Sequence, residues 1–161
     1  MTSTLTFTTD LRAGADAVWA RAITPDGIND ELRPVLRMTI PAGGLDLDAA
    51  ALALPARLGR SWLLLGRVLP VDYDDLVIEE LSDGHFLERS QMATLRPWVH
   101  ERTVTPLAGG CRVTDQLTFA LRPPLNRVPG ARRLAELIVA TLFRHRHRRL
   151  VQHWGAAEPA A

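Results

Sequence analysis

Hydrophobic residues recur at helical spacing through Ala131–Trp154, the longest such pattern in the chain. Five positions three or four residues apart form one stripe: Leu134, Leu137, Ile138, Thr141 and Leu142. The segment contains neither proline nor glycine, and Gly155 follows it as a helix terminator. The stripe continues through His145, Arg149 and His153, so its apolar character gives way to imidazole and guanidinium groups. We expect a long helix that packs against the rest of the protein through this stripe.

Most of the preceding chain alternates between apolar and polar residues or is rich in β-formers, which is typical of strands. Seven strands are predicted, at Thr4–Thr9, Leu36–Ile40, Arg60–Leu69, Tyr73–Leu81, His85–Met92, Trp98–Thr105 and Cys111–Leu121. Two short helices, Asp16–Ile23 and Pro25–Leu32, are expected after the first strand. The stretch Leu45–Leu58 is ambiguous, and Asp48–Leu54 within it fits one or two helical turns. This order predicts an α+β fold in which one antiparallel sheet curls around the long helix and encloses a space.

The final hairpin can be registered from its own pattern. With Ala108-Gly109 as the turn, the facing pairs are Val104/Val113, Arg102/Asp115, His100/Leu117 and Trp98/Phe119. The opposite face of these strands is almost entirely polar, so the mostly apolar face is predicted to point inward. A shift of one residue would exchange the two faces, which is why the pattern determines the register. His100, Arg102 and Asp115 are therefore expected inside the protein.

The strand before this hairpin gives a weaker pattern, because neither of its faces is cleanly apolar. A bend centred on Leu95 would place Glu88 opposite Arg102, Ser90 opposite His100 and Met92 opposite Trp98. Glu88, Arg102 and Asp115 would then form a charged row on the inner wall. Two interpretations stay open: a structural network that satisfies itself, or a set of polar anchors in a ligand cavity.

Composition narrows the functional classes. The 161 residues are 47% hydrophobic and 23% charged, as in an ordinary globular domain, and no apolar run approaches the roughly 20 residues of a membrane-spanning helix. The N-terminus has no signal-peptide features, and Cys111 is the only cysteine. We therefore expect a cytoplasmic protein with neither an intrachain disulfide nor a paired-cysteine zinc site.

Other candidate sites are weaker. The run Arg144–Arg149 is basic, but it lies near a helix end and lacks interleaved aromatics, so no nucleic-acid partner is expected. His145 and His147 lie on different sides of the helix, which argues against a shared metal, and His145 either closes a cavity or is a packed core histidine. One acidic group fits the turn at a strand start better than a metal site: Asp72, Asp74 and Asp75. No metal or cofactor is expected, since no nucleotide-binding or hydrolase motif is present.

Several runs together resemble bacterial proteins of the START-like SRPBCC superfamily: Pro25–Pro34, Leu58–Trp62, Leu69–Leu76, Phe86–Ser90, Trp98–Arg102 and Phe143–Leu150. The resemblance covers about residues 5–154 and points to a subgroup labelled as hypothetical ligand-binding proteins. It implies a helix-grip fold, with a seven-stranded antiparallel sheet around a C-terminal helix and two short helices after the first strand. One domain would cover 1–155, with a disordered tail at 156–161. Superfamily members bind lipids, sterols, polyketides or plant metabolites, and some are polyketide aromatase/cyclases.

The leading hypothesis is a binding protein for a small apolar or aromatic molecule, lipid- or polyketide-like, in a closed cavity of about several hundred Å³. Its apolar wall would come from Trp98, Phe119, Leu117, Met92, Leu134 and Ile138, and its polar anchors from Arg102, Glu88, Asp115, His100, Ser90 and His145. The alternative is an enzyme of cyclase or dehydratase type, in which His100 is the general acid–base and Glu88 tunes it. A third hypothesis is an interaction protein, for example a homodimer.

Overall fold

The computed structural model describes residues 1–44 and 53–157 and confirms the α+β fold. Within these ranges one antiparallel sheet has the strand order β1-β7-β6-β5-β4-β3-β2. The strands are β1 (Ser3–Leu11), β2 (Leu36–Met38), β3 (Ala56–Leu65), β4 (Leu69–Ser82), β5 (His85–Met92), β6 (Leu95–Leu107) and β7 (Gly110–Leu121). The helices are α1 (Ala15–Ala22), α2 (Pro25–Leu32) and α3 (Ala131–Trp154), with a 3-10 turn η1 (Leu125–Arg127) before α3.

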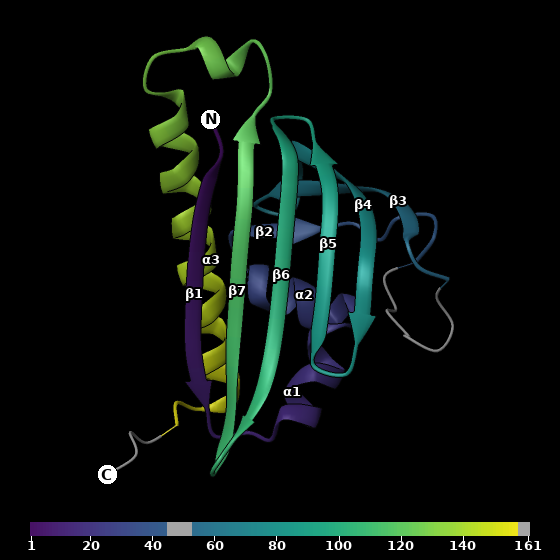
Figure 1. Ribbon diagram of the computed structural model, residues 1–161, viewed down its shortest axis with the longest axis vertical. Coiled ribbons are helices and arrows are strands. Elements are labelled where there is room, and N and C mark those ends of the chain that lie inside the picture. The colour runs from purple at the N-terminus through teal and green to yellow at the C-terminus, as the bar shows by residue number, and fades with distance from the viewer. Residues whose placement is uncertain (45–52, 158–161) are drawn as a thin grey trace.

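The sheet curls around α3 as the helix-grip layout requires. In Figure 1, α3 lies behind β1 and β7, while α1 and α2 lie behind the lower part of the sheet. The predicted strand Arg60–Leu69 runs beyond the end of β3 at Leu65. The chain turns there at Gly66 and Arg67, both of which have positive φ. β4 accordingly begins at Leu69, four residues before its predicted start. The long β4 carries the sheet around toward β3 and β2, on the side away from β1.

The register of the last hairpin is as predicted. Trp98 faces Phe119, His100 faces Leu117, Arg102 faces Asp115 and Val104 faces Val113. All eight of these residues are buried. The mostly apolar face of β6 and β7 therefore forms the inner wall. It also carries three buried polar side chains: His100, Arg102 and Asp115.

The predicted register of β5 against β6 is wrong by two residues. Glu88 faces His100 and Ser90 faces Trp98, while Phe86 takes the place beside Arg102. The reason is that the turn between β5 and β6 is centred on Thr94, one residue before the expected Leu95, as the pairing of Ser90 with Trp98 shows. Because a shift of two preserves which face each side chain occupies, Glu88, Ser90 and Met92 still point inward.

The face that α3 turns to the sheet differs from the predicted stripe. Val139, Ala140, Phe143, His147 and Leu150 are buried. Three residues of the predicted stripe remain 57–59% exposed: Leu134, Leu137 and Ile138. Compared with the prediction, α3 is rotated about its own axis. Val139 and Phe143 make its contact with the sheet, and the more apolar stripe lies beside this contact.

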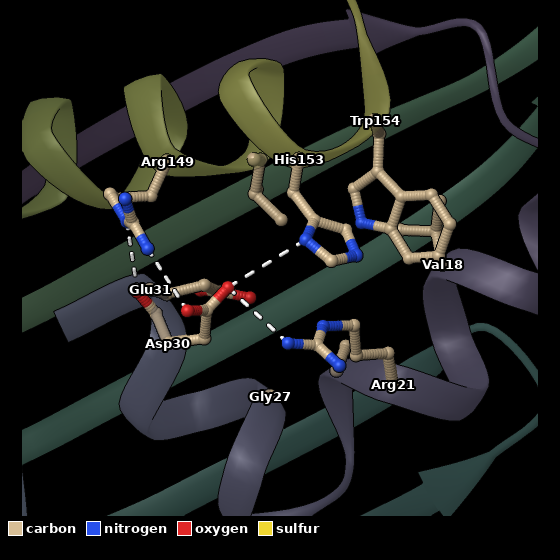
Figure 2. A pocket seen from close by; sticks show the side chains of 10 residues that line it. Val18, Arg21, Gly27, Asp30, Glu31, Arg149, His153 and Trp154 are labelled. Atoms are coloured by element: carbon tan, nitrogen blue, oxygen red, sulfur yellow. Dashed lines mark hydrogen bonds and ion pairs between the residues drawn. The ribbon is translucent and has the colours of Figure 1, made fainter. Parts of the chain in front are cut away.

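An ion cluster fixes the C-terminal end of α3 against α1 and α2 (Figure 2). The Asp30 carboxylate lies 2.9 Å from Arg149 Nη2, 3.3 Å from Arg21 Nη2 and 3.8 Å from His153 Nδ1. The recess between these side chains measures only about 10 Å³, the space of roughly one water molecule. Arg149 and His153 therefore hold α3 in place and do not extend a ligand site.

The two segments expected to be irregular lie mostly outside the described residues. That applies to 48–52 of the helical turns suggested for Asp48–Leu54, and to 158–161 of the expected tail. Ala156 and Ala157 belong instead to the ordered fold, because Ala156 pairs with Leu11 and the Ala157 amide donates to Asp10 O at 3.0 Å. Among the described residues, no helix has the length and apolar character needed to cross a membrane.

Candidate functional site

A cavity of about 1050 Å³ lies between α3 and the part of the sheet that curls away from it. Apolar side chains form most of its wall. From the sheet come Met38, Leu58, Leu63, Leu76, Ile78, Met92 and Trp98, and from α3 come Leu134, Ala135, Leu137, Ile138, Leu142 and Phe143. The cavity is larger than expected and is open to solvent beside α3, since Leu134, Leu137 and Ile138 line it while more than half exposed.

Asp72 and Thr94 bring polar groups to the wall on the sheet side, and so do three buried side chains: Asp74 of β4, Glu88 of β5 and His100 of β6. Each of these three buried side chains is only 3–6% exposed to solvent. Glu88 Oε2 lies 3.6 Å from His100 Nδ1, and the His100 ring packs edge-on against Phe86 and Phe143 at centroid distances of 5.0 and 5.2 Å. The strands therefore hold three titratable groups in a row at one place in an apolar cavity.

The two acids of this row differ in pKa. Burial, followed by the negative charge of Glu88 and a hydrogen bond to it, raises the pKa of Asp74 well above its ordinary value. Burial also works to raise the pKa of Glu88, but hydrogen bonds from His100, Asp74 and Ser90 and the charge of His100 outweigh it, so that this pKa is lowered. The pKa values of the two neighbouring acids are thus driven apart, and over the pH range between them the pair is a carboxylic acid beside a carboxylate.

Two oxygens of the acid pair have no hydrogen-bond partner. Among the described residues, Asp74 Oδ1 and Glu88 Oε1 are the buried side-chain polar atoms left without one. Buried polar groups nearly always have a hydrogen-bond partner, so each of these unpaired oxygens calls for a physical explanation. Both residues line the cavity, which is where a partner would be.

Behind His100 lies a fully connected ion network. Asp115 receives two hydrogen bonds from Arg102, at 2.8 Å each, and lies 2.7 Å from His100 Nε2 and 2.9 Å from His147 Nε2. Burial opposes its ionisation, but the charge and hydrogen bonds of Arg102 and His100 hold the pKa of Asp115 well below its usual range. Since Asp115 is ionised, both imidazoles donate to it through Nε2.

Glu31 of α2 completes this network. It accepts from Arg102 at 2.7 and 2.8 Å and from Arg146 of α3 at 2.8 and 3.0 Å. The predicted row, in which Glu88 was the second carboxylate of Arg102, is therefore wrong. The two-residue difference in register moves Glu88 to His100, and α2 places Glu31 where Glu88 was expected.

Seven of the predicted ligand contacts line the cavity: Glu88, Met92, Trp98, His100, Leu134, Ile138 and His145. The other five do not line it: Ser90, Arg102, Asp115, Leu117 and Phe119. Leu117 and Phe119 lie in the core because Val139 and Phe143 of α3 pack directly on β7. Ser90 accepts from the Val77 amide at 3.1 Å, and His145 Nε2 lies 2.7 Å from Arg33 O, so both polar groups are engaged.

Asp74 was not predicted as a cavity residue, since Asp72, Asp74 and Asp75 were interpreted as a turn at a strand start in preference to a metal site. A signal existed, because Asp74 alternates in phase with Leu76 and Ile78, which form the inner face of β4. Asp72 also lines the cavity but accepts from the Thr94 hydroxyl at 2.5 Å, while Asp75 pairs with Arg57. Glu31, Arg146 and His147 were missed as well.

Solved structures share this fold at low sequence identity. The START superfamily protein from Mycobacterium smegmatis matches with a TM-score of 0.61 and 12% identity, over 92% of this chain and 97% of that one. The Zhui aromatase/cyclase from Streptomyces sp. R1128 matches with a TM-score of 0.68 and 14% identity, over 95% and 93%. Protein CV1439 from Chromobacterium violaceum gives 0.67 and 11%, over 96% and 99%. These likenesses confirm the START-like fold that the sequence resemblance implied.

None of the curated protein sequences matches the chain. One family model does, and it spans residues 9–154, which include every strand except the start of β1 and all three helices. The chain therefore belongs to the family described as Domain of unknown function (DUF8410).

Proposed function

We propose that the protein binds a small apolar or aromatic molecule in the cavity between the sheet and α3. The observation that carries this proposal is an open cavity of about 1050 Å³ whose wall is mostly apolar and contains a few convergent polar groups. Ligand sites usually have this composition. The START superfamily protein and the aromatase/cyclase that share the fold support the same proposal.

A titration with Nile red, an uncharged apolar dye, tests the proposal. We expect saturable binding of the dye with enhanced fluorescence. The paired substitution Leu134→Trp/Ile138→Trp places two indoles on the wall one helical turn apart and should abolish binding. Arg144→Trp is the matched control, because Arg144 is exposed on the same helix and does not line the cavity. Equal binding by the wall variant and the control would refute the proposed site.

The acid pair favours a second candidate, an enzyme of cyclase or dehydratase type. Such chemistry needs a proton donor and a proton acceptor side by side, and neighbouring titratable groups whose pKa values are driven apart provide them. The pKa of Asp74 is raised beside Glu88, whose pKa is lowered, and His100 also lines the cavity. A synthetic poly-β-ketone thioester would be the test substrate. His100→Gln should abolish its cyclisation and spare Nile red binding, whereas equal loss of both would favour binding alone.

A further inference from the structure

We propose that the ligand of this cavity carries a hydrogen-bond-donating end group, an amine or a hydroxyl, which Asp74 Oδ1 and Glu88 Oε1 accept. A ligand with a carboxylate at that end would be rejected. The inference rests on the proposed function and adds to it the chemical class of the ligand.

The first support is that two hydrogen-bond acceptors at one place on the wall lack donors. Asp74 and Glu88 are 5% and 6% exposed, and each leaves one oxygen without a partner. An unsatisfied buried acceptor carries an energetic penalty that a donor from the ligand would remove. Because two such acceptors come from the adjacent strands β4 and β5, one ammonium group near them could serve both, and a hydroxyl could serve one of them.

The second support is the sign of the charge. The pKa of Asp74 is raised and that of Glu88 is lowered, so over the pH range between them the pair carries one negative charge. The surrounding wall is mostly apolar, and charge interactions are strong in such surroundings. A protonated amine would be attracted to the pair, a hydroxyl would be tolerated as a donor, and a carboxylate would meet like charge.

The third support is that nearby donors are already engaged. His100 Nε2 donates to Asp115, and the Thr94 hydroxyl donates to Asp72. Arg102 donates to Glu31 and Asp115 and does not line the cavity. Near Asp74 and Glu88 the sheet side of the wall therefore presents acceptors, while the arginines that line the cavity, Arg146 and Arg148, come from α3.

Four pyrene derivatives that differ only in their end group test the inference: 1-pyrenemethylamine, 1-pyrenemethanol, 1-methylpyrene and 1-pyrenecarboxylic acid. Energy transfer from tryptophan reports binding, since Trp98 lines the cavity. We expect the amine to bind at least about tenfold more tightly than the methyl compound, the value that corresponds to one hydrogen bond to a charged group. The alcohol should fall between them, and the carboxylate should bind most weakly.

The variant Asp74→Asn/Glu88→Gln keeps the shapes and removes the charge. It should lose the preference for the amine while binding 1-methylpyrene as the native protein does. Unchanged amine preference in this variant, or native binding of the carboxylate as tight as that of the amine, would overturn the inference and leave the proposed function standing. If none of the four compounds binds the native protein, the proposed function fails, and the inference fails with it. The order measured with the native protein alone tests the inference even if the variant does not fold.

Discussion

Replacement of Asp74 by asparagine should make the protein more stable, increasingly so as the pH rises. Asp74 is buried beside ionised Glu88, and its pKa lies well above the ordinary value of 3.8. A carboxyl group with a raised folded-state pKa favours folding fully below its unfolded-state pKa, and this contribution is lost as the pH rises toward the folded-state value. Asparagine does not titrate, and its amide donates to Glu88 as the protonated acid does.

The size of the effect follows from linkage. Between the unfolded-state and folded-state pKa values of Asp74, the native protein binds one proton more than the unfolded chain. Its free energy of unfolding then falls by about 1.4 kcal/mol for each pH unit relative to a variant without this group. The window begins near the ordinary value of 3.8 and extends upward, because the pKa is raised. From pH 5 toward neutrality the advantage of Asp74→Asn should therefore grow by up to roughly this amount per unit.

Urea denaturation at several pH values measures this difference directly. Asp83→Asn is the matched control, because Asp83 is exposed in the turn between β4 and β5 and its replacement should give a difference that does not change with pH. A difference between Asp74→Asn and the native protein that is constant across the range would refute the reasoning. Such a result would mean that Asp74 is ionised in the folded state and that the acid pair does not share a proton.

Three other substitutions test the packing around the site. Glu31→Ala should lower the free energy of unfolding by roughly 3–5 kcal/mol, because Arg102 and Arg146 would lose their shared carboxylate inside the protein; a loss below about 1 kcal/mol in urea denaturation would contradict the network. Phe143→Ala should cost roughly 3–5 kcal/mol by the same assay, since the ring is 1% exposed and packs against Phe7. Gly110→Ala would place Cβ 1.9 Å from Leu11 O, so the β1 amides should exchange hydrogen faster than in the native protein, and unchanged protection would contradict this geometry.

The sequence determined the inner wall best where alternation is unambiguous. On β6 and β7 one face is apolar and the other is almost entirely polar, so the register and the inward direction of His100 and Asp115 both follow from the pattern. On β5 no such contrast exists, and the turn into β6 is centred on Thr94, one residue earlier than expected, which no local pattern reveals. The face of each side chain was predicted correctly there, whereas its partner was not.

Long-range ion pairs explain most of what the sequence did not reveal. Glu31 and Arg102 are separated by 71 residues, and nothing in the short helix Pro25–Leu32 marks one of its acids as buried. On α3, Arg146 and His147 are buried although hydrophobicity favours the stripe through Leu134 and Ile138. Burial of these two polar residues depends on carboxylates from α2 and β7, so it becomes predictable only once the tertiary contacts are known.

The two groups of buried charges on this wall differ in a way that bears on function. Arg102, Asp115 and Glu31 satisfy one another, so the fold is able to complete a polar network in its interior. Asp74 and Glu88, which both line the cavity, each keep an unpaired oxygen. If the pair serves the fold, its replacement should lower the free energy of unfolding. If the pair serves a ligand, its replacement should raise the free energy of unfolding and weaken binding. The double variant Asp74→Asn/Glu88→Gln should therefore raise stability while losing the preference for the amine, and a loss of both would assign the pair to the fold instead of the ligand.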